Sequence, residues 1–251
     1  GAAEGGDLAT LLPAVLALRE EAQEKNGGPR VRVGAGGAIG TPEAAACALL
    51  LGADFLQTGS VNLSSLEAQT PDAVKELLAK LEAGETVSAP SAEGFSLGGR
   101  VQVVKKGTFF APRAQKLYEL FRFYDSLEAI DPVVREKIEQ TYLKRSFDQI
   151  WQEVRETPPA GSSGVDPKTR MARVFRWYLE QSLRWALDGD LAEKVNCQMP
   201  CDESMAAFNR YAAGNGLADP ASRSAAAIAR SLLRDTATYL SHRLSAMSHR
   251  V

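Results

Sequence analysis

Residues 31–65 constrain the fold of this chain more than any other stretch of the sequence. The stretch begins with a short β-branched run that ends at Val33, and this pattern predicts a strand. A loop rich in glycine follows at once, in residues 34–40. Thr41 suits the N-cap of a helix and Pro42 suits its first position, so the sequence predicts that a helix begins here.

A second strand and a second turn complete this unit. Residues 53–57 are apolar and predict a strand, which ends in the small-residue turn Thr58-Gly59-Ser60. Turns built from glycines and hydroxyls offer backbone N–H groups to a phosphate. In a (β/α)₈ barrel, the turns after strands seven and eight are the usual phosphate site. An ordinary α/β crossover with tight turns would carry the same glycines, and the spacing is not the dinucleotide-binding fingerprint.

Composition excludes several classes of function. The chain has 251 residues and is 45% hydrophobic, which is enough for a sizeable core in one large domain or two. A net charge of −2 gives no basic field for nucleic acid, and no apolar run is long enough to span a membrane. Three cysteines, an odd number, favour a reducing compartment, so we expect a cytoplasmic protein. Cys197 and Cys201 have no histidine nearby, so we expect no metal site.

The pattern of the chain changes near residue 84. Before it, helical and strand patterns alternate as in a parallel sheet, starting with a helix over residues 8–25 that carries an apolar stripe. After it, residues 86–99 read as a loop and residues 101–104 as a short strand, and the remainder is mostly helical. The long helix that follows Asp166 carries the clearest apolar stripe of the chain. A Pro-, Gly- and Ser-rich loop over residues 157–164 precedes it.

Four segments together resemble a known family. They read GAGGAIGTPEAAACALLLGADFLQTGSVN, GGRVQVVKKGTFFAPRAQKLYELFRFYDSLEAI, MARVFRWYLEQSLRW and CDESMAAFNRYAAG. The chain resembles the trans-acting enoyl reductases of polyunsaturated fatty acid and polyketide synthases. These belong to a wider group of flavin-dependent proteins that includes the nitronate monooxygenases. The second segment is the most specific to the family, because the Gly-rich segment alone would fit many flavin barrels.

The resemblance implies an α/β fold and a flavin cofactor. Residues 1–84 would be the last βα units of a TIM barrel that binds flavin mononucleotide (FMN), and residues 85–251 a mainly helical C-terminal region. The FMN phosphate would lie on the two turns described above. The residues implied to bind it are Gly36, Gly37 and Ala38 on the first turn and Gln57, Gly59 and Ser60 on the second. NADPH would reduce the flavin, which would then pass hydride to an α,β-unsaturated thioester.

The sequence departs from the family pattern in three ways. A barrel needs eight strands, and about two are recognisable here, with a strand end at residues 2–3 as a further candidate. The wider group has a histidine after a Gly-Gly turn, where this chain has Asp7 after Gly5-Gly6, so no catalytic residue is assigned. The two histidines, His242 and His249, lie far away and are expected at the surface. The order of Ala and Gly in the first loop also differs slightly, so the phosphate donors are expected within one residue of those named.

The resemblance also implies a carrier-bound substrate and leaves alternatives open. An acidic acyl carrier protein would present the enoyl thioester, and the basic residues Arg100, Lys105, Lys106 and Arg113 form a candidate docking patch. A solvated charged face would look the same. Two alternatives to the reductase are a non-catalytic interaction module of a synthase complex and a nitronate-monooxygenase-like oxidase. A homodimer is one assembly that the sequence leaves open.

Overall fold

The computed structural model describes residues 7–155 and 165–248, and they form two compact units. Unit 1 comprises the chain up to Glu85 together with the residues from Cys201 onward, and unit 2 runs from Thr86 to Pro200. The first boundary lies between Glu85 and Thr86. The predicted helical region 85–251 is divided, because its last part packs with the N-terminal segment. The Gly5-Gly6 pair, the predicted loop at 157–164, the candidate strand end at 2–3 and His249 lie outside the described residues.

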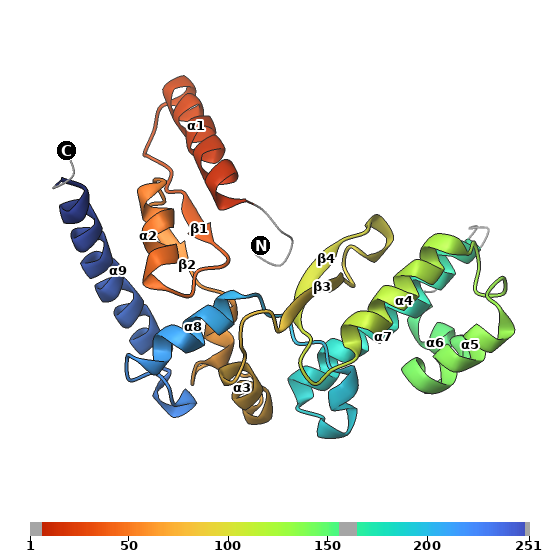
Figure 1. The fold of residues 1–251 in the computed structure, drawn as a ribbon. Helices are drawn as coiled ribbons and strands as arrows, with labels where there is room; N and C mark the ends of the chain where they lie inside the picture. The colour runs from red at the N-terminus through yellow and green to blue at the C-terminus, as the bar shows by residue number, and fades with distance from the viewer. Residues whose placement is uncertain (1–6, 156–164, 249–251) are drawn as a thin grey trace. The chain divides into compact units, whose positions relative to one another are not determined.

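Unit 1 combines a small parallel sheet with helices from both ends of the chain (Figure 1). Its elements are α1 (Leu8–Asn26), β1 (Gly34–Gly36), α2 (Pro42–Leu50), β2 (Phe55–Gln57), the short 3₁₀ helix η2 (Ser60–Ser64), α3 (Asp72–Ala79), α8 (Ser204–Ala213), the 3₁₀ turn η6 (Pro220–Ser222) and α9 (Ala225–Ser248). The blue helix α9 packs along α2 in Figure 1. Thr41 caps α2 by accepting the Ala44 N–H at 3.3 Å, as the sequence predicts.

The two strands of unit 1 pair in parallel, but β1 lies later in the chain than the sequence pattern indicates. We expected a strand ending at Val33 and a loop from Gly34, whereas Gly34–Gly36 is the strand and pairs with Phe55–Gln57. The second strand likewise begins at Phe55 rather than residue 53. The physical reason is the pairing itself, because the Phe55 ring lies where a side chain at position 34 would be. A Cβ there would fall 2.2 Å from the ring, so a side chain at position 34 would require the half-exposed Phe55 ring to move.

The hydrophobic cluster around the parallel sheet of unit 1 is built mostly from small side chains. Leu12, Ile39 and several alanines form it, among them Ala45 and Ala48 of α2. The apolar stripe predicted on α1 is largely solvent-exposed: Leu12 is buried, whereas Leu11 is 53% and Leu18 63% exposed. Periodicity therefore predicted this helix, but most of its apolar face does not pack within the described residues.

Unit 2 begins with an antiparallel hairpin and continues as a helical layer (Figure 1). Its elements are β3 (Thr86–Pro90), the 3₁₀ turn η3 (Phe95–Leu97), β4 (Arg100–Val104), α4 (Phe110–Phe123), α5 (Pro132–Ile138), the π-helical turn η4 (Glu139–Leu143), α6 (Phe147–Val154), α7 (Pro167–Asp188) and the 3₁₀ helix η5 (Leu191–Asn196). The prediction of a loop over residues 86–99 is wrong in its first part. Cross-strand pairing with β4 makes Thr86–Pro90 a strand despite its Ser, Ala and Pro content.

The core of unit 2 is large and aromatic. The stripe predicted on α7 is buried, with Phe175 and Tyr178 at its centre, and α4 contributes Leu117 and Phe121. Phe147 of α6 meets Phe175 edge to face, with ring centroids 5.8 Å apart. Helical periodicity therefore predicted the buried faces of this unit correctly.

The described residues form an α-rich fold with two two-stranded sheets, one of them parallel. The βαβ unit agrees with the predicted α/β class, while membership of a barrel stays a prediction. No helix among residues 7–155 and 165–248 is long and apolar enough to cross a membrane.

Candidate functional site

The two predicted turns leave the same edge of the parallel sheet. Gly36 and Gln57 are paired across the strands, and each is the last residue of its strand. In open parallel sheets, ligands bind beyond the carboxyl ends of the strands. Both residues are solvent-exposed, as are Ala38 and Gly59, so a ligand can reach this edge. The structure thus brings together the six residues that the sequence analysis selected.

The first turn bends through two successive residues with positive φ. Gly37 has φ 93° and Ala38 has φ 54°. Successive backbone N–H groups in a turn can form a concave site for an anion. An alanine in the left-handed region is uncommon, so the surrounding structure must hold this turn.

The second turn is fixed by a pair of side-chain hydrogen bonds. The Thr58 hydroxyl donates to the Asn62 amide oxygen at 2.9 Å, and the Asn62 amide NH₂ donates back to the Thr58 carbonyl at 2.9 Å. Gly59 lies between them, and a Cβ on it would meet no atom within 4 Å. The turn therefore presents open space next to its backbone.

Asp202 contacts both turns, and the sequence analysis did not select it. Its backbone N–H donates to the Ser60 hydroxyl oxygen at 3.0 Å, and one carboxylate oxygen accepts the Ala38 N–H at 3.4 Å. The other carboxylate oxygen accepts hydrogen bonds from the Ser204 N–H, at 3.0 Å, and from the Ser204 hydroxyl, and so caps the first N–H of α8 from the residue before the N-cap Glu203. Local sequence signals such a cap, but nothing local indicates a contact with Ala38.

Segment 201–204 approaches the first turn very closely. A Cβ on Gly40 would lie 2.3 Å from the Ser204 carbonyl oxygen, which is backbone and cannot rotate away. Gly40 therefore permits the approach that brings Asp202 to this edge. The glycine was visible in the sequence, but its packing partner was not.

The thiol of Cys201, next to Asp202 in the chain, is protonated at neutral pH. Burial, reinforced by the negative charge of Asp202, raises the pKa of Cys201 to about 12, and a hydrogen bond involving Ser60 acts in the opposite direction. Such a thiol is a poor nucleophile. Cys47, Cys197 and Cys201 are all free, and the described residues contain no cluster of three metal-binding side chains. His242 is exposed, as predicted, so no catalytic acid is assigned.

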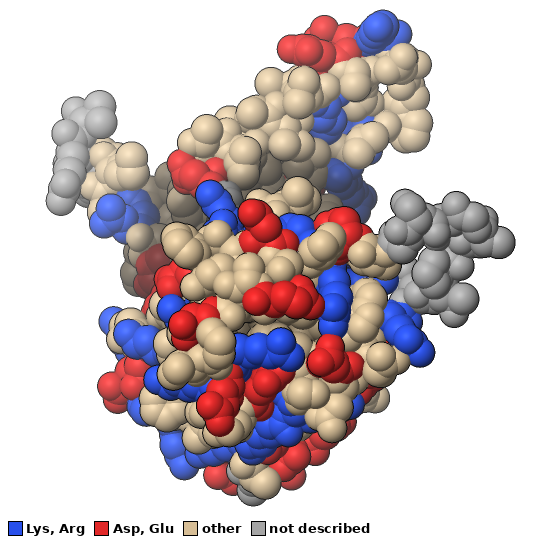
Figure 2. All heavy atoms as spheres, turned by 90° about the vertical axis from the view of Figure 1, so that its right-hand side faces the viewer, with Lys and Arg blue, Asp and Glu red and all other residues tan. Residues whose placement is uncertain are grey.

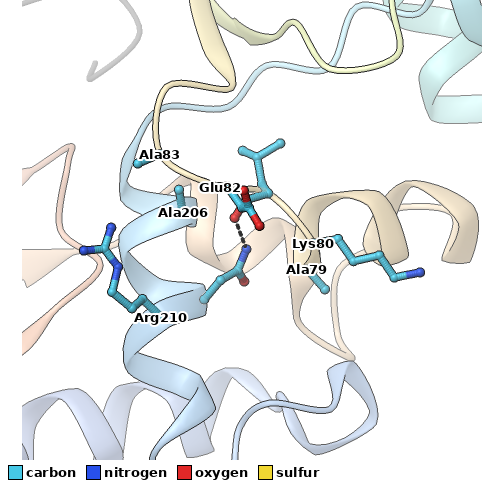
Figure 3. Close-up of a pocket in the computed structure, with 8 residues that line it drawn as sticks. Ala79, Lys80, Glu82, Ala83, Ala206 and Arg210 are labelled. Atoms are coloured by element: carbon cyan, nitrogen blue, oxygen red, sulfur yellow. Dashed lines mark hydrogen bonds between the residues drawn. The ribbon is translucent and has the colours of Figure 1, made fainter.

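A separate pocket of about 430 Å³ lies between α3 and α8. Lys80, Glu82 and Arg210 contribute to its wall, and the amide of Asn209 donates to the Leu81 carbonyl beside it. Figure 3 shows the Lys80 and Arg210 side chains extending in opposite directions rather than converging on one point. None of the six selected residues lines this pocket.

The four residues of the candidate docking patch differ in their surroundings. The Arg100 guanidinium donates to the Ser88 hydroxyl and carbonyl at 2.8 Å and to Gln115, and Arg113 donates to the Asn196 side chain. Lys105 and Lys106 are exposed on the turn after β4. Figure 2 shows basic and acidic residues interspersed over the face it presents, not a field of one sign.

Part of unit 2 matches a family model. Residues 124–197 match the inserted helical domain of [acyl-carrier-protein] S-malonyltransferase. This segment includes α5, α6 and α7.

The chain is also similar to proteins of polyketide and polyunsaturated fatty acid synthesis. It is 39% identical to polyketide biosynthesis protein PksE of Bacillus subtilis, over 98% of this chain and 33% of that protein. It is 38% identical to one of the polyunsaturated fatty acid synthase proteins of Thraustochytrium, over 84% of this chain and 15% of that protein. The chain thus spans a third or less of these relatives.

A solved structure matches nearly the whole chain. The enoyl reductase domain of MlnA, from the macrolactin biosynthesis cluster of Bacillus amyloliquefaciens, superposes with a TM-score of 0.91 at 38% identity. The match covers 98% of this chain and 57% of that one. The chain is thus similar to part of an enoyl reductase domain and to parts of proteins of polyketide and polyunsaturated fatty acid synthesis.

Proposed function

We propose that this chain belongs to an FMN-dependent enoyl reductase that acts in trans on α,β-unsaturated acyl thioesters in polyketide or polyunsaturated fatty acid synthesis. The observation that carries the proposal is the pair of turns at one edge of a parallel sheet, in a chain that superposes on an enoyl reductase domain. The turns are those that the sequence alone selected for a phosphate. We further propose that the parallel pair belongs to a flavin-binding barrel.

The backbone of this edge suits a phosphate group. The N–H groups of Gly37, Ala38 and Gly59 lie on turns without bulky side chains, and Ser60 adds a hydroxyl. Gly36 and Gln57 would flank the group from the strand ends. One feature opposes the fit, because the Asp202 carboxylate already accepts the Ala38 N–H. When bound, FMN supplies the transfer of hydride from NADPH to the thioester.

The proposal includes an acyl carrier protein as the partner that presents the substrate. One relative is a polyketide biosynthesis protein and another a subunit of a polyunsaturated fatty acid synthase, and the proposed substrate is a carrier-bound thioester. Of the candidate docking patch, the exposed Lys105 and Lys106 are suited to meet an acidic surface. The guanidinium groups of Arg100 and Arg113 form hydrogen bonds within unit 2.

A flavin titration of the purified protein tests the proposal. We expect the protein to quench FMN fluorescence and to bind FMN more tightly than riboflavin, which lacks the phosphate. NADPH should then bleach the bound flavin, and an enoyl thioester should restore its colour. Failure to bind FMN would favour the interaction module, and reoxidation by a nitronate but not by an enoyl thioester would favour the oxidase.

The Gly59→Arg variant tests whether the second turn binds the phosphate. The side chain would enter open space, so the fold should be retained while the phosphate position is crowded. We expect the preference for FMN over riboflavin to disappear and riboflavin affinity to persist. Gly214→Arg, on an exposed glycine after α8, adds the same side chain away from the turns and should leave both affinities unchanged.

A further inference from the structure

We infer that Asp202 is an internal competitor for the anion at this edge, so that its carboxylate limits the affinity of the two turns for phosphate. The inference rests on the proposed function in that it concerns the same site. It adds a residue that tunes specificity and that lies 164 positions from the turn it contacts.

Asp202 forms hydrogen bonds with both turns of the candidate site. Its carboxylate accepts the Ala38 N–H, the same donor that the first turn would offer to a phosphate. The backbone N–H of Asp202 donates a hydrogen bond to the Ser60 hydroxyl oxygen on the second turn. One residue is therefore bonded to both turns, and a carboxylate stands where the site would receive an anion.

The negative charge of Asp202 would repel a phosphate bound at this edge. A bound phosphate would share this edge with the Asp202 carboxylate, and like charges at short range repel most strongly where water is partly excluded. The 3.4 Å contact with Ala38 is long for a charge-assisted hydrogen bond, so this donor can be exchanged at small cost. The Ser204 bonds hold the carboxylate in place by capping α8, which explains why it does not simply swing away.

The placement of Asp202 is built into the fold. Gly40 leaves no room for a side chain because the Ser204 carbonyl would lie 2.3 Å from its Cβ, so segment 201–204 is seated against the first turn. The half-buried Asp202 thus belongs to the wall of the site rather than to a mobile surface.

Asp202→Asn separates the charge from the packing. Asparagine keeps a side-chain oxygen that can accept the Ser204 N–H, so α8 stays capped, whereas the negative charge is lost. Glu203→Gln is the matched control, because it removes one negative charge from the next residue, whose carboxylate accepts the Gly84 N–H at 3.1 Å instead. Thermal unfolding followed by circular dichroism verifies that each variant folds.

The first measurement uses inorganic phosphate and needs no flavin. Phosphate is titrated into flavin-free protein while the Ala38 amide resonance is followed by NMR. We expect this resonance to respond at roughly tenfold lower phosphate in Asp202→Asn than in the parent or in Glu203→Gln, because one like charge beside the anion is gone. The inference is overturned if phosphate leaves the Ala38 resonance unchanged in all three proteins. It is also overturned if phosphate affinity rises equally in Asp202→Asn and Glu203→Gln.

The second measurement compares FMN with riboflavin. Asp202→Asn should tighten FMN binding and leave riboflavin binding unchanged, because only FMN carries the phosphate. Equal or weaker FMN binding in this variant overturns the inference. If neither the parent nor the variants bind FMN, but the Ala38 resonance still changes on addition of phosphate as expected, the inference stands and the proposed cofactor is wrong.

Discussion

The helical core of unit 2 and the cluster around the parallel sheet of unit 1 are packed in different ways. Unit 2 buries large aromatic side chains such as Phe147 and Phe175, whereas the cluster around the sheet of unit 1 consists mostly of alanines, and Leu11 and Leu18 of α1 are exposed. Unit 1 nevertheless carries the two turns selected for a phosphate. The contrast shows that the candidate site is formed by small residues and backbone, where close approach matters more than buried apolar area.

The largest effect should come from the core of unit 2. Phe175→Ala removes a fully buried ring and should lower the free energy of unfolding by about 3–5 kcal/mol. All three tryptophans, Trp151, Trp177 and Trp185, lie in unit 2, so urea unfolding followed by tryptophan fluorescence reports this unit.

Leu97→Ala is the control for this substitution. Leu97 belongs to the same unit but is 94% exposed, so its removal should change stability by less than about 0.5 kcal/mol. Comparable losses in the two variants would contradict the contrast between a packed core and a tolerant surface.

A smaller effect is expected from crowding the backbone of unit 1. Gly40→Ala places a Cβ against the Ser204 carbonyl and should cost about 1–3 kcal/mol, measured by urea unfolding followed by circular dichroism. Gly214→Ala would make an ordinary 3.9 Å contact and should be nearly neutral. A neutral Gly40→Ala would mean that segment 201–204 does not press on the first turn.

A charge reversal in the candidate docking patch should change the rate of the reaction rather than the stability of the fold. Lys105→Glu should slow turnover of a carrier-bound thioester about three- to tenfold by reversing an exposed charge, and should leave a small thioester analogue unaffected. Lys137→Glu, an equally exposed reversal on α5, should change neither rate. Equal slowing of both substrates by Lys105→Glu would remove this surface from the proposal.

The smallest effect concerns the start of the parallel sheet. The Val33 N–H, with the charges of Arg30 and Arg19, holds the pKa of Asp54 below its ordinary value of 3.8. A carboxyl group with a lowered folded pKa stabilises the fold above the unfolded value and loses that contribution as pH falls through the folded one. Unfolding midpoints should therefore drop less between pH 5 and pH 3 in Asp54→Asn than in the parent. An identical pH dependence in the two proteins would show that this carboxylate contributes nothing.

The sequence by itself determined the local features of this protein. The caps at Thr41 and Asp166 mark the starts of α2 and α7, and the buried stripe of α7 follows from helical periodicity. The two turns also follow from glycines and hydroxyls placed after apolar runs. These features depend on residues a few positions apart, so the local sequence contains the information.

Only the tertiary structure decided the features that depend on distant partners. Pairing with Phe55–Gln57 placed β1 at Gly34–Gly36, and pairing with β4 made a strand of Thr86–Pro90. The return of the chain after Pro200 brought Asp202 to Ala38 and Ser60. Such contacts join residues far apart along the chain, and no local propensity encodes them, because their energy arises when the partners meet.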